Sequence, residues 1–134
     1  MTTYLIGTDS EQASQVICDH LEGTLGSDAT LTVIHVMTSS DIEERRDGET
    51  ALEVFNDRFE ETDIPVSTTQ FNREASPTEE LLREADAIDA DQIVTALRRH
   101  SRTERVIFGS VSHSLIEQTP RPLTLVPLPE YNPD

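Results

Sequence analysis

The sequence contains no lysine, and all ten of its basic residues are arginines. The chain therefore has no P-loop lysine, no lysine for a Schiff base and no lysine for a receiver-domain phosphorylation site. Tryptophan is also absent, and there is a single cysteine, Cys18, which cannot form an internal disulfide. This cysteine usage fits a reducing compartment. Because Cys18 lies among apolar residues at helical spacing, we predict a buried, unreactive thiol.

Long apolar runs are missing too, since no stretch approaches the ~20 residues of a membrane span. The first residues, MTTYLIGTDSEQ, lack the basic region and cleavage site of a signal peptide. We therefore expect a cytoplasmic protein that does not bind membranes. The apolar residues make up only 35% of the chain but are clustered, which indicates a folded protein. We expect one domain over residues 1–134, with residues 127–134 as a tail.

Positive charge is scarce: 26 acidic residues against ten arginines give a net charge of −16. Such a charge repels nucleic acid and anionic membranes, so neither is an expected partner. Repulsion among these charges also destabilises the folded state unless salt screens it. At molar salt the Debye length is only ~3 Å. The absence of lysine favours a salt-loving source over an ordinary acidic protein. We predict that the fold loosens in low salt.

Apolar patterning predicts five strands alternating with four helices. The expected strands are 4–7, 30–37, 65–71, 92–95 and 123–126. The expected helices run from Asp9 or Ser10 to about Leu25, over 51–61, from Ser76 to Ile88, and from Gly109–Ser110 with Val111, Leu115 and Ile116 on the buried side. Residues 38–50 show no apolar period and are predicted to be a mobile loop.

This alternation, with connections too long for hairpins, predicts a parallel, doubly wound α/β sheet with helices on both faces. The clearest local signal is Ser76-Pro77-Thr78-Glu79. Serine is a preferred N-cap, proline suits the first helical position and Glu79 completes a capping box. The polar, β-branched strand at 65–71 suits a sheet edge.

The segment after the fourth strand is the candidate binding site. A loop between a strand and a helix N-terminus is where open α/β sheets bind anions. Four of the ten arginines lie in this loop: Arg98, Arg99, Arg102 and Arg105. Two interpretations remain open: the guanidinium groups bind a phosphate or similar anion, or they pair with carboxylates of this chain or of a partner.

The sequence resembles the universal stress protein family over its whole length. That family carries a loop motif, Gly-x-x-Gly-x9-Gly-Ser/Thr, that binds the phosphates of ATP. The corresponding positions here are Ala96, Arg99, Gly109 and Ser110, so the final Gly-Ser is present and both loop glycines are replaced. The stretch VIFGSVSHSLIEQTPRPLTLV resembles the end of the family's loop, its fourth helix and its fifth strand.

The resemblance implies a fold of the adenine nucleotide alpha hydrolase type, a five-stranded sheet with strand order 3-2-1-4-5. It also implies a crevice for ATP or AMP, or for another phosphate-bearing ligand. Gly7-Thr8-Asp9-Ser10 resembles the family segment whose Asp contacts the nucleotide, and His35-Val36 matches a common His-Val whose Val backbone meets adenine. The implied site comprises Thr8, Asp9, Val36, Ala96, Arg98, Arg99, Gly109, Ser110 and Val111.

The two replaced glycines change what this loop can bind. Glycine lets the backbone turn with positive φ and approach a triphosphate closely, whereas Arg99 adds a long side chain there. We therefore expect a stress-response regulator or binding module that does not bind ATP in the usual way. The alternatives are a genuine ATP- or AMP-binding member, or one with slow ATP hydrolysis or self-phosphorylation on Ser110 or Ser112. No spacing indicates other catalytic residues or a metal site, and His35 is predicted to be a hydrogen-bonded core residue.

The fifth strand, Leu123-Thr124-Leu125-Val126, is apolar and predicted to lie at an edge of the sheet. An uncovered apolar edge strand favours association. Members of the family commonly dimerise through this strand, so we expect a homodimer. A regulatory protein partner of unknown identity is also expected.

Overall fold

The computed structural model describes residues 2–72, 75–97 and 110–128. In these ranges, strands and helices alternate along the chain. The strands are β1 (Thr2–Gly7), β2 (Ala29–Val36), β3 (Val66–Phe71), β4 (Gln92–Leu97) and β5 (Leu123–Pro127). The helices are α1 (Glu11–Glu22), α2 (Ile42–Arg58), α3 (Pro77–Ile88) and α4 (Ser110–Gln118).

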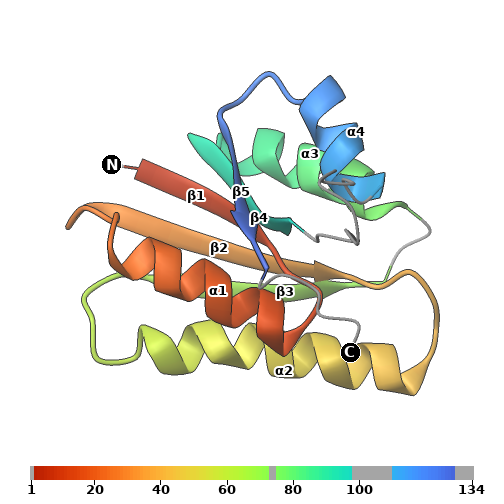
Figure 1. The fold of residues 1–134 in the computed structure, drawn as a ribbon, viewed down its shortest axis with the longest axis horizontal. Coiled ribbons are helices and arrows are strands. Elements are labelled where there is room, and N and C mark those ends of the chain that lie inside the picture. Colours follow the sequence, from red (N-terminus) through yellow and green to blue (C-terminus); the bar gives the residue numbers. More distant parts are fainter. Residues whose placement is uncertain (1, 73–74, 98–109, 129–134) are drawn as a thin grey trace, which may run out of the picture.

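The strands form one parallel sheet in the order β3-β2-β1-β4-β5, which confirms the predicted topology. Helices α1 and α2 cover one face, and α3 and α4 cover the other (Figure 1). Because all the strands run the same way, their carboxyl ends meet at one edge of the sheet. β3 and β5 are the outer strands, as predicted.

A hydrophobic core lies on each side of the sheet. The core under α1 and α2 includes Ile17, Phe55 and Val94, and the core under α3 and α4 includes Leu5 and Leu115. None of the helices in the described ranges is long and apolar enough to cross a membrane.

The Cys18 thiol is fully buried in the core under α1 and α2, as predicted. Burial raises its pKa to about 12, so the thiol stays protonated at neutral pH.

Two predicted helix starts are confirmed by their caps. The Ser76 hydroxyl accepts a hydrogen bond from the backbone N–H of Glu79 at 3.1 Å, and Pro77 is the first residue of α3. At α1 the cap is Ser10 rather than Asp9, since the Ser10 hydroxyl accepts from the backbone N–H of Ala13 at 3.1 Å. Each such cap satisfies a backbone donor that has no partner within the helix.

The prediction that residues 38–50 form a mobile loop is wrong over most of that range. Helix α2 begins at Ile42, nine residues earlier than the predicted start at residue 51. Its N-cap is Asp41, whose side chain accepts from the backbone N–H of Glu43 at 3.0 Å. The first turns are polar because they lie over the open end of the sheet, where an apolar stripe has nothing to cover.

A second correction concerns α4. Leu115 is fully buried as predicted, but Ile116 is 48% exposed. Successive helical residues point about 100° apart, and in α4 Leu115 faces the sheet while Ile116 faces solvent. Val111, one turn before Leu115, packs against the same core instead.

Candidate functional site

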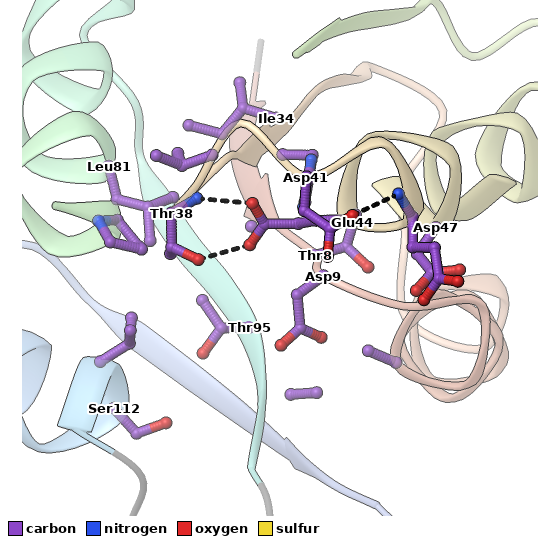
Figure 2. A pocket seen from close by; sticks show the side chains of 18 residues that line it. Thr8, Asp9, Ile34, Thr38, Asp41, Glu44, Asp47, Leu81, Thr95 and Ser112 are labelled. Carbon is purple, nitrogen blue, oxygen red and sulfur yellow. Dashed lines mark hydrogen bonds between the residues drawn. The ribbon is translucent and has the colours of Figure 1, made fainter. Parts of the chain in front are cut away.

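A pocket of about 530 Å³ lies at the carboxyl ends of β1, β2 and β4 (Figure 2). In the strand order β3-β2-β1-β4-β5, the chain leaves β1 toward β2 on one side and later returns to β4 on the other. This change of direction opens a crevice between the strand ends, which is where doubly wound folds bind their ligands. The strand order therefore determines where the pocket lies, and the helices form its walls.

One part of the pocket is apolar. Its lining includes Ile34 and Val36 from β2, Leu81 from α3 and Val111 from α4. Gly7 at the end of β1 allows α3 to come close, because a Cβ atom there would lie only 2.9 Å from Leu81 Cδ2. Apolar walls of this kind suit a flat ring or another hydrophobic moiety.

The opposite part is acidic. Its carboxylates come from the loop after β1 and from the start of α2: Asp9, Asp41, Glu43, Glu44 and Asp47. No lysine or arginine is among the lining residues in the described ranges. The described wall therefore repels negative charge and favours hydroxyl or amino groups that donate hydrogen bonds.

Glu44 is partly buried in the acidic part of the pocket. Its carboxylate accepts hydrogen bonds from the backbone N–H groups of Thr38 and Ser39, both at 2.9 Å, and from both hydroxyls (Figure 2 shows the contact with Thr38). Hydrogen bonds to the charged form lower the pKa of Glu44, with the Thr38 hydroxyl as the largest cause. Glu44 thus fixes the β2–α2 connection beside the pocket.

His35 is a buried core residue, as predicted, with 2% of its surface exposed. Gln70 Nε2 donates to the carbonyl of Arg45 at 2.9 Å and lies 3.1 Å from His35 Nδ1. Since the contact with the carbonyl identifies this atom as the amide nitrogen, His35 Nδ1 must accept, which requires a neutral ring. Burial lowers the pKa of His35, in agreement with that assignment.

The pocket hydroxyls differ in their partners. Thr8 Oγ1 lies 2.7 Å from Ser14 Oγ, which in turn donates to the carbonyl of Ala51 at 2.7 Å. Thr95 is 94% buried, yet among the described residues its Oγ1 has no hydrogen-bond partner. Ser112, in the first turn of α4, is also buried at the pocket. In the described ranges, no group of three or more histidine, cysteine or acidic side chains is arranged to hold a metal ion.

Comparison with known proteins agrees with this geometry. The sequence pattern of the family described as "Universal stress protein family" matches residues 1–127. The chain belongs to the universal stress protein family. Among curated proteins it is 40% identical over 53 residues to the stress response protein NhaX of Bacillus subtilis (strain 168). That match spans 40% of this chain and 32% of NhaX, about a third of its length.

Solved structures of universal stress proteins share the fold. A universal stress protein from Archaeoglobus fulgidus superposes with a TM-score of 0.75 at 17% identity, covering 94% of this chain and 98% of the other. A family protein from Arabidopsis thaliana, solved with AMP bound, gives a TM-score of 0.68 at 16% identity, covering 96% and 93%. At these identities the likeness establishes the fold and not the ligand.

The structure brings together five of the predicted ligand residues of this universal stress protein. All five line the pocket: Thr8, Asp9, Val36, Ala96 and Val111. Arg98, Arg99 and Gly109 lie outside the described residues, as do the other loop arginines, so neither interpretation of the arginines is tested. Ser110 begins α4, but its side chain is not described. The role of these residues in binding stays a prediction.

Two described arginines show how this protein uses guanidinium groups elsewhere. Arg58 joins α2 to Asp19 and Glu22 of α1 at 2.7 and 2.8 Å. Arg121, before β5, lies 2.7 Å from Asp86 of α3 and donates to the carbonyl of Ala90 at 2.8 Å. Both arginines connect elements that are distant in the sequence.

Sequence reasoning missed the α2 wall of the pocket and the hydroxyl of Thr95. Asp41 followed by Glu43 and Glu44 is an N-cap pattern with acidic residues in the first turn, and it could have located the start of α2. Thr95 carried no comparable signal, because a threonine in a buried strand is ordinary and only the fold shows what surrounds it.

Proposed function

We propose that this universal stress protein is a regulatory binding module that holds an adenine nucleotide in the β1–β2–β4 pocket and takes AMP in preference to ATP. The observation that carries the proposal is the pocket itself, which gathers the strand ends and the start of α4 around one crevice. Its apolar part suits the base, and its acidic part offers acceptors for ribose hydroxyls. The AMP bound to the Arabidopsis relative supports this choice.

The preference for AMP follows from charge and from backbone space. Each further phosphate adds negative charge beside a wall with five carboxylates. At the two loop positions where the family has glycine, this chain has Ala96 and Arg99. Both replacements restrict the close backbone approach that a triphosphate needs. We place this activity in the cytoplasm, where the single buried thiol stays reduced.

Narrowing the pocket should abolish binding. In Val111→Trp a large ring replaces a side chain that lines the apolar wall. We expect wild-type protein in 2 M KCl to bind AMP about tenfold more tightly than ATP, and the variant to lose about tenfold or more in AMP affinity, measured by isothermal titration calorimetry. Ile116→Trp is the matched control, since Ile116 lies on the same helix but is 48% exposed. Wild-type protein that binds neither nucleotide, or a variant that binds as well as the control, contradicts the proposal.

We further propose that the protein is a homodimer that pairs through the outer edge of β5. Ile93 N–H donates to the carbonyl of Pro122, and Leu128 N–H donates to that of Leu97. Alternate residues of a parallel strand bond to the same neighbour, so the backbone groups of Leu123 and Leu125 point away from β4. Leu123, Thr124 and Leu125 are partly exposed, and Val126 is buried. An apolar strand whose outward backbone groups bond to no other described residue is suited to pair with a second copy.

A charge at this edge should separate the subunits. We expect wild-type protein in 2 M KCl to show twice the chain mass of 15.0 kDa by light scattering, and Leu125→Lys to show the single-chain value. Leu25→Lys, which introduces the same charge at another partly buried leucine after α1, should remain dimeric. A monomeric wild-type protein would contradict the proposed dimer.

A further inference from the structure

Thr95 differs from the other threonines of the pocket. The Thr8 hydroxyl is hydrogen-bonded to that of Ser14, and the Thr38 hydroxyl donates to Glu44. Thr95 has 6% of its surface exposed, and its Oγ1 is without a hydrogen-bond partner in the part of the chain that the structure describes. A buried hydroxyl without a partner weakens a fold, and valine of the same shape would avoid that cost. The position therefore carries a polar atom that the described fold does not use.

Thr95 lines the pocket, so a ligand there can reach this side chain. In the sheet register, Thr95 on β4 stands opposite Gly7 on β1. Residues paired across strands project their side chains from the same face of the sheet, and glycine projects none. Figure 2 shows the Thr95 side chain among the pocket-lining groups, between those of Ser112 and Asp9. The Leu81 side chain occupies the space beside Gly7, so the room next to the unpartnered hydroxyl is the pocket that Thr95 lines.

We propose that the Thr95 hydroxyl hydrogen-bonds the uncharged nucleoside part of the bound ligand and so helps to determine which ligand the pocket accepts. This inference rests on the proposed nucleotide-binding function. A hydroxyl both donates and accepts, so it can pair with a ring nitrogen, an amino group or a ribose hydroxyl. The carboxylates of the opposite wall, when ionised, only accept. Thr95 thus adds a buried donor that none of the described residues engages.

Thr95→Val tests the inference because it removes the hydroxyl and keeps the shape. We expect its dissociation constants for AMP and for adenosine to rise by the same factor, about five- to tenfold, in calorimetric titrations in 2 M KCl. Equal losses identify a contact with the nucleoside rather than with the phosphate. Without ligand, we expect the variant to melt about 2 to 5 °C higher than the wild type, because an unused buried polar group is gone.

Thr69→Val is the matched control, since it makes the same change at an exposed position of the edge strand β3. It should alter neither binding nor melting. If the wild type binds AMP and Thr95→Val binds AMP and adenosine equally well, the Thr95 inference fails while the proposed function stands. A loss for AMP alone also overturns it, because it assigns Thr95 to the phosphate.

The melting measurement decides about Thr95 even if the wild type binds no nucleotide, an outcome that defeats the proposed function by itself. A ligand-free Thr95→Val protein that melts at the same or a lower temperature means that the hydroxyl is satisfied within the folded protein, and it overturns the inference. A higher melting temperature supports a hydroxyl that the fold retains for a ligand.

Discussion

Gly48→Ala is expected to lower the free energy of unfolding by about 2 kcal/mol, although alanine is the better helix former. Gly48 lies in α2, where the helix crosses β2 and β3. A Cβ atom there would lie 2.1 Å from His35 Nδ1 and 2.7 Å from Gln70 Nε2, well inside van der Waals contact. The imidazole is 2% exposed and hydrogen-bonded to Gln70, so a shift away from the new Cβ atom would break that bond.

Thermal unfolding in high salt measures the effect of Gly48→Ala, and a fall of about 5 to 10 °C in Tm is expected. Gly23→Ala provides the control, because a Cβ atom at Gly23 meets nothing closer than the carbonyl oxygen of His20 at 3.8 Å. That variant should melt within ~2 °C of the wild type. If the two variants melt alike, α2 does not approach His35 as closely as described.

The second large effect concerns salt, since we propose that this protein is adapted to a salt-rich cytosol. With a net charge of −16, the acidic side chains repel one another, and five carboxylates line a single pocket. Two like charges 8 Å apart cost about 0.5 kcal/mol in water, and many such pairs add up to a few kcal/mol. Because salt screens them, raising KCl from 0.1 to 2 M should increase Tm by about 10 °C.

Calorimetric or spectroscopic melting over a KCl series tests this proposal. Glu43→Gln combined with Asp47→Asn removes two exposed charges from the pocket wall, so its Tm should depend less steeply on KCl than that of the wild type. A Tm that does not change with salt would rule out the adaptation.

Most of the fold followed from local signals in the chain. The apolar run at Ala29–Val36, the cap at Ser76 and the terminal apolar strand at Leu123 are each readable within about ten residues. Short crossovers then leave few ways to arrange five parallel strands. Among these, the order β3-β2-β1-β4-β5 was predicted from the resemblance to the family, and the structure confirms it.

The first half of α2 could not be predicted in the same way. Its residues, Ile42 to Glu49, contain no apolar stripe, and they are stabilised by contacts that form only in the folded protein. Glu44 binds the backbone of Thr38 and Ser39, and Gly48 lies against His35. A helix that is stabilised by contacts with a neighbouring strand needs no apolar periodicity in its own sequence, so the sequence pattern does not reveal it.

The sequence by itself determined the element order, the parallel sheet, the buried thiol and the position of the candidate site at the strand ends, because each depends on local patterning and on chain connectivity. Only the tertiary structure decided that carboxylates at the start of α2 line this pocket. It also decided that Thr95 is buried beside Gly7, with no hydrogen-bond partner for its hydroxyl among the described residues. Both facts depend on which side chains from distant segments share one crevice. Spacing along a chain does not encode that proximity, because it is set by how the helices pack on the sheet.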